Sequence, residues 1–271
     1  MKRTEECVDR LAGARRVVIK AGSRVLVQRN GRPDGRRLRG LVKQIAKLHA
    51  QGIEVVLVTS GAIGAGIAAL GLTERPKDLP GIQMAAAVGQ LNLMSRYAEL
   101  FKQERRKVGQ VLLTHDDFHE RVRTRNARRT IERMLDQGVI PIVNENDVVA
   151  VEEIAVDVRK LGDNDVLAAL VTGLIGADVL IMLTTADGLR EPAGGNRTRR
   201  VSYVKKVTRS IHALVRKETR TLSTGGMGSK LKAVDDATQA GATAVIADGR
   251  KPGVISDIMS GKDVGTYFEG Q

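Results

Sequence analysis

The chain has 271 residues, of which 42% are hydrophobic, and its formal net charge is +13. This length and composition predict a globular protein with one large core or two modest ones, and they exclude an intrinsically disordered chain. The positive charge points to anionic partners, but aromatic residues make up only 2% of the chain and tryptophan is absent, so few side chains could stack on bases. Because the basic residues are also dispersed, we expect solvated surfaces and no nucleic-acid partner.

Cysteine content and hydropathy bear on the compartment. The single cysteine, Cys7, excludes an intramolecular disulfide framework and fits a reducing environment. No apolar stretch accompanies the charged N-terminus, so we expect no secretory signal. Segment 166–183 is the one apolar stretch of nearly membrane-spanning length, but Asp178 and several small or polar residues interrupt it, as in a buried helix followed by a buried strand. We therefore expect a cytoplasmic protein without membrane contact.

Short runs of β-branched residues alternate with helical patterns along the chain. The sequence predicts strands at 16–19, 53–58, 109–113, 139–143, 179–183 and 244–247, and helices at 38–51, 63–70, 82–102, 126–137, 165–173 and 230–240. This alternation favours βαβ units around a mainly parallel sheet that is covered by helices on both faces. The expected fold class is α/β, a three-layer α/β/α sandwich without internal repeats.

Polar and glycine-rich segments follow four of the predicted strands. They are 20–23 (Lys-Ala-Gly-Ser), 59–62 (Thr-Ser-Gly-Ala), 144–147 (Asn-Glu-Asn-Asp) and 184–185 (Thr-Thr). The carboxyl ends of the strands line the ligand crevice in an open α/β sheet, so we expect these segments to converge on one site. A further polar cluster, 162–165 (Gly-Asp-Asn-Asp), precedes a predicted helix. Acids and amides so crowded are costly to bury unpaired, which indicates the polar floor of a small-molecule site.

Two glycine-rich segments, 59–66 and 224–230, lie where predicted helices begin. Free backbone N–H groups and the positive end of the helix can hold phosphate or carboxylate there, although the glycines could instead serve tight packing alone. Gly64 and Gly66 fit the relaxed dinucleotide fingerprint only formally, because they follow the second strand. Ser229 precedes Lys230, the reverse of the order in a Walker motif. We expect a phosphate site of another type.

Several of these segments together resemble the glutamate 5-kinase (γ-glutamyl kinase) family, in order and with near-family spacing from about residue 15 to residue 268. The matching segments are 20–23, 59–63, 144–147, 162–165 and 224–230, with further matches at 125–128 (Arg-Asn-Ala-Arg) and 251–255 (Lys-Pro-Gly-Val-Ile). The resemblance implies the amino-acid kinase fold as a single domain over 1–271, with 1–14 as an N-terminal extension and without the PUA domain of many members. It also implies transfer of the ATP γ-phosphoryl group to the side chain of L-glutamate, the first step of proline biosynthesis.

The chemistry of that reaction suits the residues present. A glutamate side chain has a pKa of about 4.3, so the nucleophile is already ionised at neutral pH and needs no general base. The histidines are scattered and are expected to be surface or helix residues; they are His49, His115, His119 and His212. The reaction does need neutralisation of charge around the transferred group, and two lysines at glycine-rich turns can supply it.

The resemblance implies a role for each matching residue. The implied catalytic residues are Lys20 and Lys230, which hold the phosphates, and Asp165, which lies between them. The implied glutamate-binding residues are Ser60, Gly61, Ala62, Asn144, Asp147, Asp163 and Asn164, with Asp147 and Asn164 holding the α-amino and α-carboxylate groups. The implied ATP-binding residues are Lys20, Gly22, Ser23, Thr184, Thr185, Thr224, Gly225, Gly226, Met227, Gly228, Ser229 and Lys230. Mg²⁺ would bridge phosphate oxygens, so no metal site made of protein groups is expected.

Three departures from the family pattern affect these roles. Thr185 stands where the family usually has aspartate, segment 155–161 is a few residues longer than usual, and Arg190 replaces a usual tyrosine before a short basic loop. We expect an altered nucleotide contact and a different lid over glutamate. The family also implies a homo-oligomer, proline as a feedback inhibitor and contact with glutamyl-phosphate reductase.

Two other interpretations remain open from the sequence. One is a kinase of the same fold that acts on acetylglutamate, carbamate or a nucleoside monophosphate, against which the clusters at 144–147 and 162–165 argue. The other is a basic nucleic-acid-binding or regulatory protein without catalysis. Such a protein would bind RNA with a steep dependence on salt and would not turn over ATP.

Overall fold

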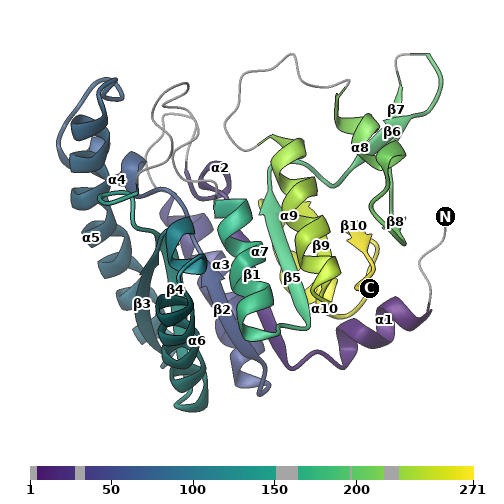
Figure 1. The fold of residues 1–271 in the computed structure, drawn as a ribbon, viewed down its shortest axis with the longest axis horizontal. Coiled ribbons are helices and arrows are strands. Elements are labelled where there is room, and N and C mark those ends of the chain that lie inside the picture. Colours follow the sequence, from purple (N-terminus) through teal and green to yellow (C-terminus); the bar gives the residue numbers. More distant parts are fainter. Residues whose placement is uncertain (1–4, 28–33, 151–163, 196, 217–225) are drawn as a thin grey trace.

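A computed structural model describes residues 5–27, 34–150, 164–195, 197–216 and 226–271 (Figure 1). The helices are α1 (Glu5–Ala12), α2 (Ser23–Leu26), α3 (Gly35–Ala50), α4 (Ala62–Ala69), α5 (Leu79–Gln103), the 3-10 helix η1 (His115–Phe118), α6 (Arg121–Asp136), α7 (Asn164–Ile175), α8 (Arg209–Arg216), α9 (Met227–Gln239) and α10 (Val254–Met259). The strands are β1 (Arg16–Ala21), β2 (Glu54–Val58), β3 (Lys107–Leu113), β4 (Val139–Glu145), β5 (Val179–Thr184), β6 (Arg190–Pro192), β7 (Thr198–Arg200), β8 (Tyr203–Val204), β9 (Thr243–Asp248) and β10 (Gly265–Phe268).

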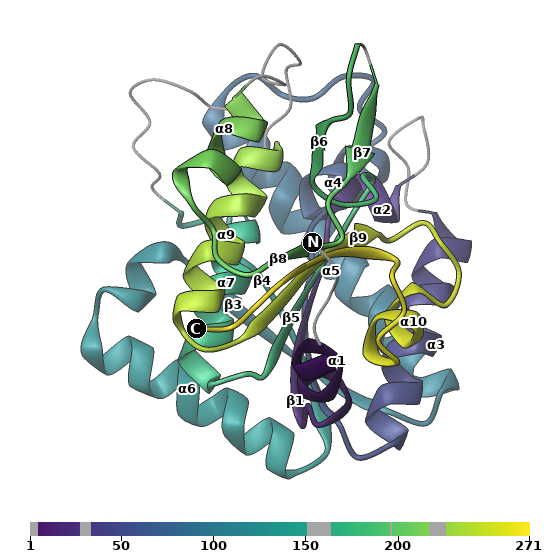
Figure 2. The same cartoon turned by 90° about the vertical axis from the view of Figure 1, so that its right-hand side faces the viewer.

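The described strands build one large sheet and a small hairpin. The large sheet has eight strands in the order β3-β4-β2-β1-β5-β9-β10-β8. Its pairs are parallel except that β10 runs antiparallel to β9. The predicted α/β fold with a mainly parallel sheet is therefore confirmed. Strands β6 and β7 form the hairpin, which extends at the same end of the molecule as α2 and α4 (Figure 2).

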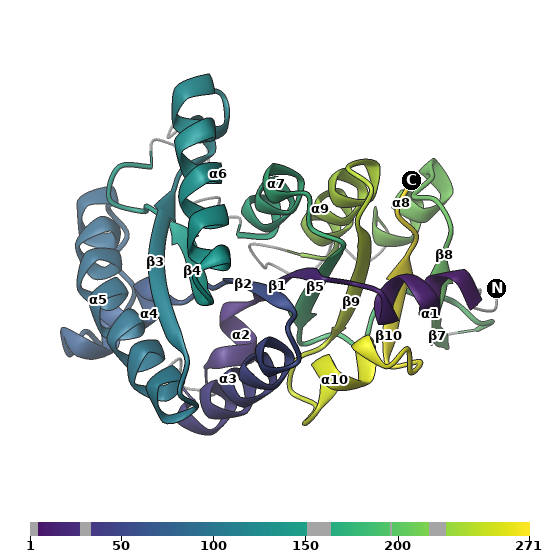
Figure 3. The same ribbon diagram turned by 90° about the horizontal axis from the view of Figure 1, so that it is seen from below.

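Helices cover both faces of the sheet, because each central strand is apolar on both sides. In β1, Val17 and Ile19 belong to one buried cluster and Val18 to the other. The first cluster receives side chains from α1, α2, α3, α5 and α10, and the second from α6, α7, α8 and α9. Viewed from below, these two helical layers lie on opposite sides of the strands (Figure 3). A sheet buried on both faces explains why the strands read as continuous hydrophobic runs.

Some elements differ from the sequence prediction. Helix α6 begins at Arg121, before the predicted start at residue 126. The sequence pattern does not predict this earlier start, because the first turns of the helix are arginine-rich and lack apolar periodicity. Strand β10 and helix α10 are not predicted from the sequence, because they are too short to show a periodic pattern of hydrophobic residues. The segment expected as an N-terminal extension contains α1, whose Leu11 is fully buried in the core. No helix in the described part of the chain is long and apolar enough to cross a membrane.

Helix α4 lies unusually close to α5, and glycines make that contact possible. A Cβ atom at Gly66 would lie 1.7 Å from the Ala85 carbonyl oxygen, and one at Gly89 would lie 1.8 Å from the Ala62 carbonyl oxygen. Close helix packing therefore explains why residue 66 is a glycine. Gly61 has a different role: its φ is +109°, and it forms the left-handed N-cap of α4. The contact holds the first turn of α4 at the carboxyl end of β2.

Candidate functional site

The centre of the site is one carboxylate between two ammonium groups. Lys20 is the penultimate residue of β1, Asp165 lies in the first turn of α7, and Lys230 lies in the first turn of α9. Lys20 Nζ lies 2.5 Å from Asp165 Oδ1, and Lys230 Nζ lies 2.8 Å from Asp165 Oδ2. The Asp165 side chain is only 1% exposed. Three elements that are distant in sequence therefore meet in one buried ion cluster.

The electrostatics of this cluster favour an anion. Burial acts to raise the pKa of Asp165, but the ammonium groups of Lys20 and Lys230 outweigh it and hold that pKa below its usual range. With one carboxylate and two ammonium groups, the cluster keeps a net positive charge. An isolated positive charge is costly to bury, so an anionic ligand would stabilise it.

Backbone groups beside the lysines suit a phosphate. The N-cap of α9 is Gly226, which supplies no side-chain cap to the first-turn N–H groups of the helix. Gly22 follows β1, and a Cβ there would lie 3.7 Å from Lys20 Nζ, so glycine keeps the space beside the ammonium group open. Donors of this kind at the start of a helix bind phosphate oxygens well. The neighbouring Ser23 is exposed, whereas Met227 and Ser229 are half-buried.

A network of side-chain amides adjoins the ion cluster. Asn164 Nδ2 donates to Ser60 Oγ (3.0 Å) and to Asn144 Oδ1 (3.2 Å). Asn144 Nδ2 in turn donates to Gln90 Oε1 (2.7 Å). Two buried atoms of this network, Asn164 Oδ1 and Gln90 Nε2, have no hydrogen-bond partner among the described residues. One is an acceptor and the other a donor, so a ligand carrying both ammonium and carboxylate groups could satisfy them.

Asp147 lies beside this network, two residues after the end of β4. It is 8% exposed and lines a pocket of about 250 Å³ together with Gln90, Glu145 and Asn146. Gln90 is the residue that the pocket and the amide network share. Ser60, Gly61 and Ala62 lie at the end of β2 and the start of α4. The structure thus brings these predicted substrate residues to one edge of the sheet.

The ends of β5 and β9 form a second half of this edge. Gly249 N–H donates to the Thr184 carbonyl (2.9 Å), and the Arg250 guanidinium donates to the Thr185 carbonyl (2.7 Å). The same guanidinium binds Asp248 through two nitrogens, at 2.8 and 2.7 Å. Burial acts to raise the pKa of Asp248, but its hydrogen bonds with Arg250 lower it overall. Arg250 therefore ties the Thr184–Thr185 turn to the end of β9.

Four residues of the site were missed by sequence reasoning. Gln90 and Tyr97 come from α5, and Tyr97 OH lies 2.9 Å from Thr59 Oγ1. His115, one of the scattered histidines, lies 3.9 Å from the buried Glu145 carboxylate. Arg250 is the fourth. No local pattern marks them, because each reaches the site through helix packing or strand order.

Some predicted residues fall elsewhere. Asp163, Thr224, Gly225 and the long segment 155–161 lie outside the described residues. The Arg190 guanidinium is held at 2.9 Å by Asp187 and by Thr198 of the β6–β7 hairpin. Within the described ranges, no group of three or more histidine, cysteine or acidic side chains could hold a metal ion.

Residues 15–248 match the amino acid kinase family. The chain is 42% identical over 260 residues to a glutamate 5-kinase of Clostridium tetani and 44% identical over 260 residues to one of Clostridium acetobutylicum, covering 95% of this chain and 96% of each relative. It is 44% identical to a glutamate 5-kinase of Moorella thermoacetica, of which it covers 69%.

Solved structures of low sequence identity share the fold. Carbamate kinase from Giardia lamblia bound to AMP-PNP matches 95% of this chain and 99% of its own with a TM-score of 0.67 at 16% identity. UMP kinase from Bacillus anthracis matches 95% of this chain and 97% of its own with a TM-score of 0.62 at 15% identity. These two structures support the three-layer architecture.

Proposed function

Because the chain belongs to the amino acid kinase family, we propose that it transfers the γ-phosphoryl group of ATP to the side-chain carboxylate of L-glutamate. This is the reaction for which its relatives, the glutamate 5-kinases, are named. The product is glutamyl 5-phosphate, and the reaction is the first step of proline biosynthesis. The observation that carries the proposal is the Lys20–Asp165–Lys230 cluster beside a network of amide side chains.

The reaction needs charge stabilisation more than proton transfer. A γ-carboxylate oxygen of glutamate forms a bond to the γ-phosphorus of ATP, the bond from that phosphorus to the β,γ-bridging oxygen breaks, and ADP leaves with the electron pair. No proton has to be removed from the ionised nucleophile. Lys20 and Lys230 stabilise the negative charge on the transferred group, and Asp165 orients both ammonium groups.

The amide network is the substrate-binding half in this proposal. Asn164 and Asp147 hold the charged groups on the α-carbon of glutamate, and Ser60, Asn144 and the start of α4 complete the site. To these we add Gln90, whose Nε2 has no hydrogen-bond partner among the described residues and can donate to a carboxylate. The four other polar or charged side chains named here, those of Asn164, Asp147, Ser60 and Asn144, are also buried or half-buried, which gives the ligand few competing waters.

The nucleotide occupies the other half of the edge. The first turn of α9 and Gly22 receive the phosphates, and the Thr184–Thr185 turn faces the nucleoside. Mg²⁺ would bind phosphate oxygens and water, where it neutralises charge on the phosphate chain.

We also propose a compartment, an oligomeric state and an inhibitor for this enzyme. The enzyme acts in the cytoplasm as a homo-oligomer, proline inhibits it by competing with glutamate, and a reductase consumes the unstable acyl phosphate. Exposed apolar side chains on α5 and β3 support self-association: Met84, Leu91 and Leu112 are 49%, 74% and 36% exposed.

A hydroxamate assay tests the reaction. The protein is incubated with ATP, Mg²⁺, hydroxylamine and one acceptor, which is L-glutamate, N-acetylglutamate or carbamate. In a separate reaction UMP is the acceptor, and the release of ADP is measured. We expect glutamyl hydroxamate and ADP with L-glutamate only. Turnover of another acceptor without glutamate turnover would overturn the proposal, as would RNA binding with no ATP turnover at all.

A further inference from the structure

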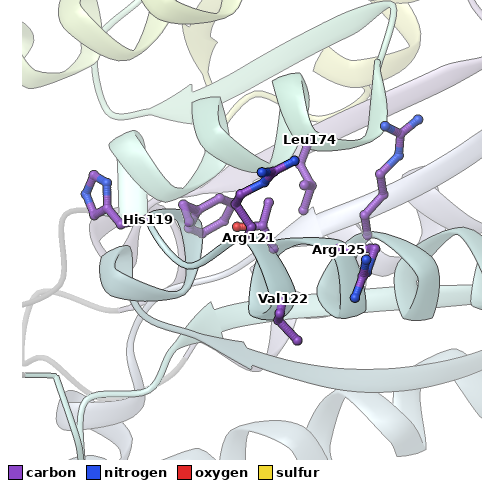
Figure 4. A pocket seen from close by; sticks show the side chains of 8 residues that line it. His119, Arg121, Val122, Arg125 and Leu174 are labelled. Atoms are coloured by element: carbon purple, nitrogen blue, oxygen red, sulfur yellow. The ribbon is translucent and has the colours of Figure 1, made fainter.

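A cavity between α6 and α7 lies away from the ion cluster. It has a volume of about 670 Å³ and is lined by Phe118, His119, Arg121, Val122, Thr124, Arg125, Arg128 and Leu174. Figure 4 shows Arg121 and Arg125 on α6 and Leu174 on the neighbouring α7. A volume between about 300 and 1,000 Å³ is typical of small-molecule sites.

The rim of this groove is basic, and the described residues neutralise little of its charge. Arg121, Arg125 and Arg128 recur at helical spacing, so they share one face of α6. Neither Arg121 nor Arg125 has an ion pair with a described residue, and Arg128 pairs only with Glu132 of its own helix, at 2.8 Å. By contrast Arg123, which is not among the lining residues, is paired with Asp117.

The placement of these arginines is unfavourable for the helix itself. The first turn of α6 contains Arg121 and no acidic residue. A positive charge at a helix N-terminus opposes the helix dipole, and arginines four residues apart, such as 121 and 125, repel each other. Among the described residues, Glu120 at the N-cap and Asp117, which pairs with Arg123, offset part of this positive charge. Neither pairs with Arg121 or Arg125, and a sequence that breaks local rules in this way points to a functional position. A bound anion would relieve both effects.

The chemistry of the groove selects the kind of anion. A guanidinium binds phosphate through two parallel hydrogen bonds. Arg121, Arg125 and Arg128 are separated by about 6 and 4.5 Å along the helix axis, which suits several linked anionic groups better than one carboxylate. Phe118, Val122 and Leu174 add an apolar floor, on which an organic ring or chain can lie.

We propose that the α6–α7 groove is a second anion site, distinct from the reaction site, that binds a small organic molecule carrying two or more phosphate groups. The motif Arg125-Asn126-Ala127-Arg128 supplies two of its three arginines. Binding here does not depend on phosphoryl transfer to glutamate, so this proposal can fail or hold independently of the proposed function.

Isothermal titration calorimetry on the full chain tests the site, with inorganic tripolyphosphate, GDP and fructose 1,6-bisphosphate as probes. The groove variant is Arg121→Gln with Arg125→Gln. The matched control is Arg129→Gln with Arg133→Gln, which removes the same charge from exposed positions of α6 outside the lining. Lys230→Ala removes one ammonium group of the reaction site and so weakens phosphate binding there relative to the groove.

We expect at least one of the three probes to bind Lys230→Ala protein at one site. The groove variant made in that background should weaken this binding by at least about 10-fold, since it loses hydrogen bonds to charged groups, and the control should not. Tighter binding of GDP would identify a nucleotide, and tighter binding of the bisphosphate a phosphorylated sugar. Equal weakening by groove and control variants would overturn the proposal, because it indicates a diffuse basic surface. Absence of binding by all three probes, or preferential binding of single-stranded RNA, would also overturn it.

A fold control accompanies the titrations. Without ligand, the groove variant should unfold at the same or a slightly higher temperature than the parent, because repulsion along α6 is reduced. Unfolding at a clearly lower temperature would show that Arg121 and Arg125 serve packing, and would count against the site.

Discussion

Asp165 shows how opposing effects are balanced at a single residue. Burial alone would favour its neutral form, yet two ammonium groups within 2.8 Å keep it ionised. Replacing one partner of a buried ion pair leaves the others uncompensated, which is costly. The cluster is therefore both a catalytic device in the proposed function and a local determinant of stability.

Lys230→Ala should lower kcat by about 100- to 1,000-fold, because it removes a donor to the charge that develops on the transferred group. The control is Lys232→Ala, an exposed lysine two residues further along α9. Steady-state ADP release with glutamate measures both variants. A kcat near that of the parent for Lys230→Ala would refute its catalytic role.

Asp165→Asn should reduce the free energy of unfolding by about 3 kcal/mol at pH 7, because two buried ammonium groups lose their counter-ion. The pKa of Asp165 is depressed in the folded state. Its contribution is therefore fully present above the unfolded-state pKa of about 3.9 and is lost as the pH falls through the lower folded-state value. Urea unfolding at several pH values should show the difference between parent and variant shrinking below about pH 4. A difference that stays constant down to pH 2 would contradict the assignment.

At the scale of elements, the site depends on how closely helices and turns approach one another. Two glycines bring α4 against α5, and the Arg250 guanidinium joins the turn after β5 to the end of β9. Neither contact touches the ion cluster directly. Both set where the binding segments lie at the carboxyl edge of the sheet.

Gly89→Ala should destabilise the protein by about 1–3 kcal/mol and raise KM for glutamate, because the new methyl group would push α4 away from α5. Gly40→Ala is the control: it lies in α3 with open space around it and should be neutral or slightly stabilising. Thermal unfolding and glutamate titrations measure both effects. Equal behaviour of the two variants would rule out a role for close packing.

Arg250→Ala should raise KM for ATP by about 10-fold, equivalent to about 1.4 kcal/mol, with a smaller change in KM for glutamate, because the Thr184–Thr185 turn loses its brace. Arg250→Lys should restore little, since lysine cannot form the two-nitrogen contact with Asp248. A parallel rise of both KM values would indicate general disruption instead.

At the scale of the whole molecule, the order of the strands decides which surfaces remain open. Strand β3 is an edge of the sheet, and α5 packs on the first core cluster beside it. Leu91 on α5 and Leu112 on β3 line the same small pocket and are both exposed. Such an apolar surface next to a sheet edge is typical of a contact between subunits.

Leu91→Glu should shift the protein towards the monomer, because it places a charge within the apolar surface of the proposed homo-oligomer. Light scattering coupled to size-exclusion chromatography gives the mass at several protein concentrations. Leu70→Glu, at an exposed leucine beyond the end of α4, is the control and should leave the mass unchanged. A parent protein that is monomeric at all concentrations would refute self-association.

Local patterns in the sequence determined most of the architecture. Hydrophobic periodicity and the glycine-rich turns were enough to predict the parallel sheet, the covering helices and the polar segments that follow β1, β2, β4 and β5. These signals are carried by residues within about one element of each other, so they survive without knowledge of the tertiary fold. The resemblance to the family then supplied the roles of the lysines and Asp165.

Only the tertiary structure decided which side chains share the site and which surfaces stay free. Gln90 meets Asn144 and Arg250 meets Thr185 because helix packing and strand order join residues that are 54 and 65 positions apart. Likewise, the sequence shows Arg121 and Arg125 only as two of many dispersed basic residues. The tertiary structure shows that they line a groove between α6 and α7. Contacts between distant segments depend on the whole set of packing interactions, which no local pattern encodes.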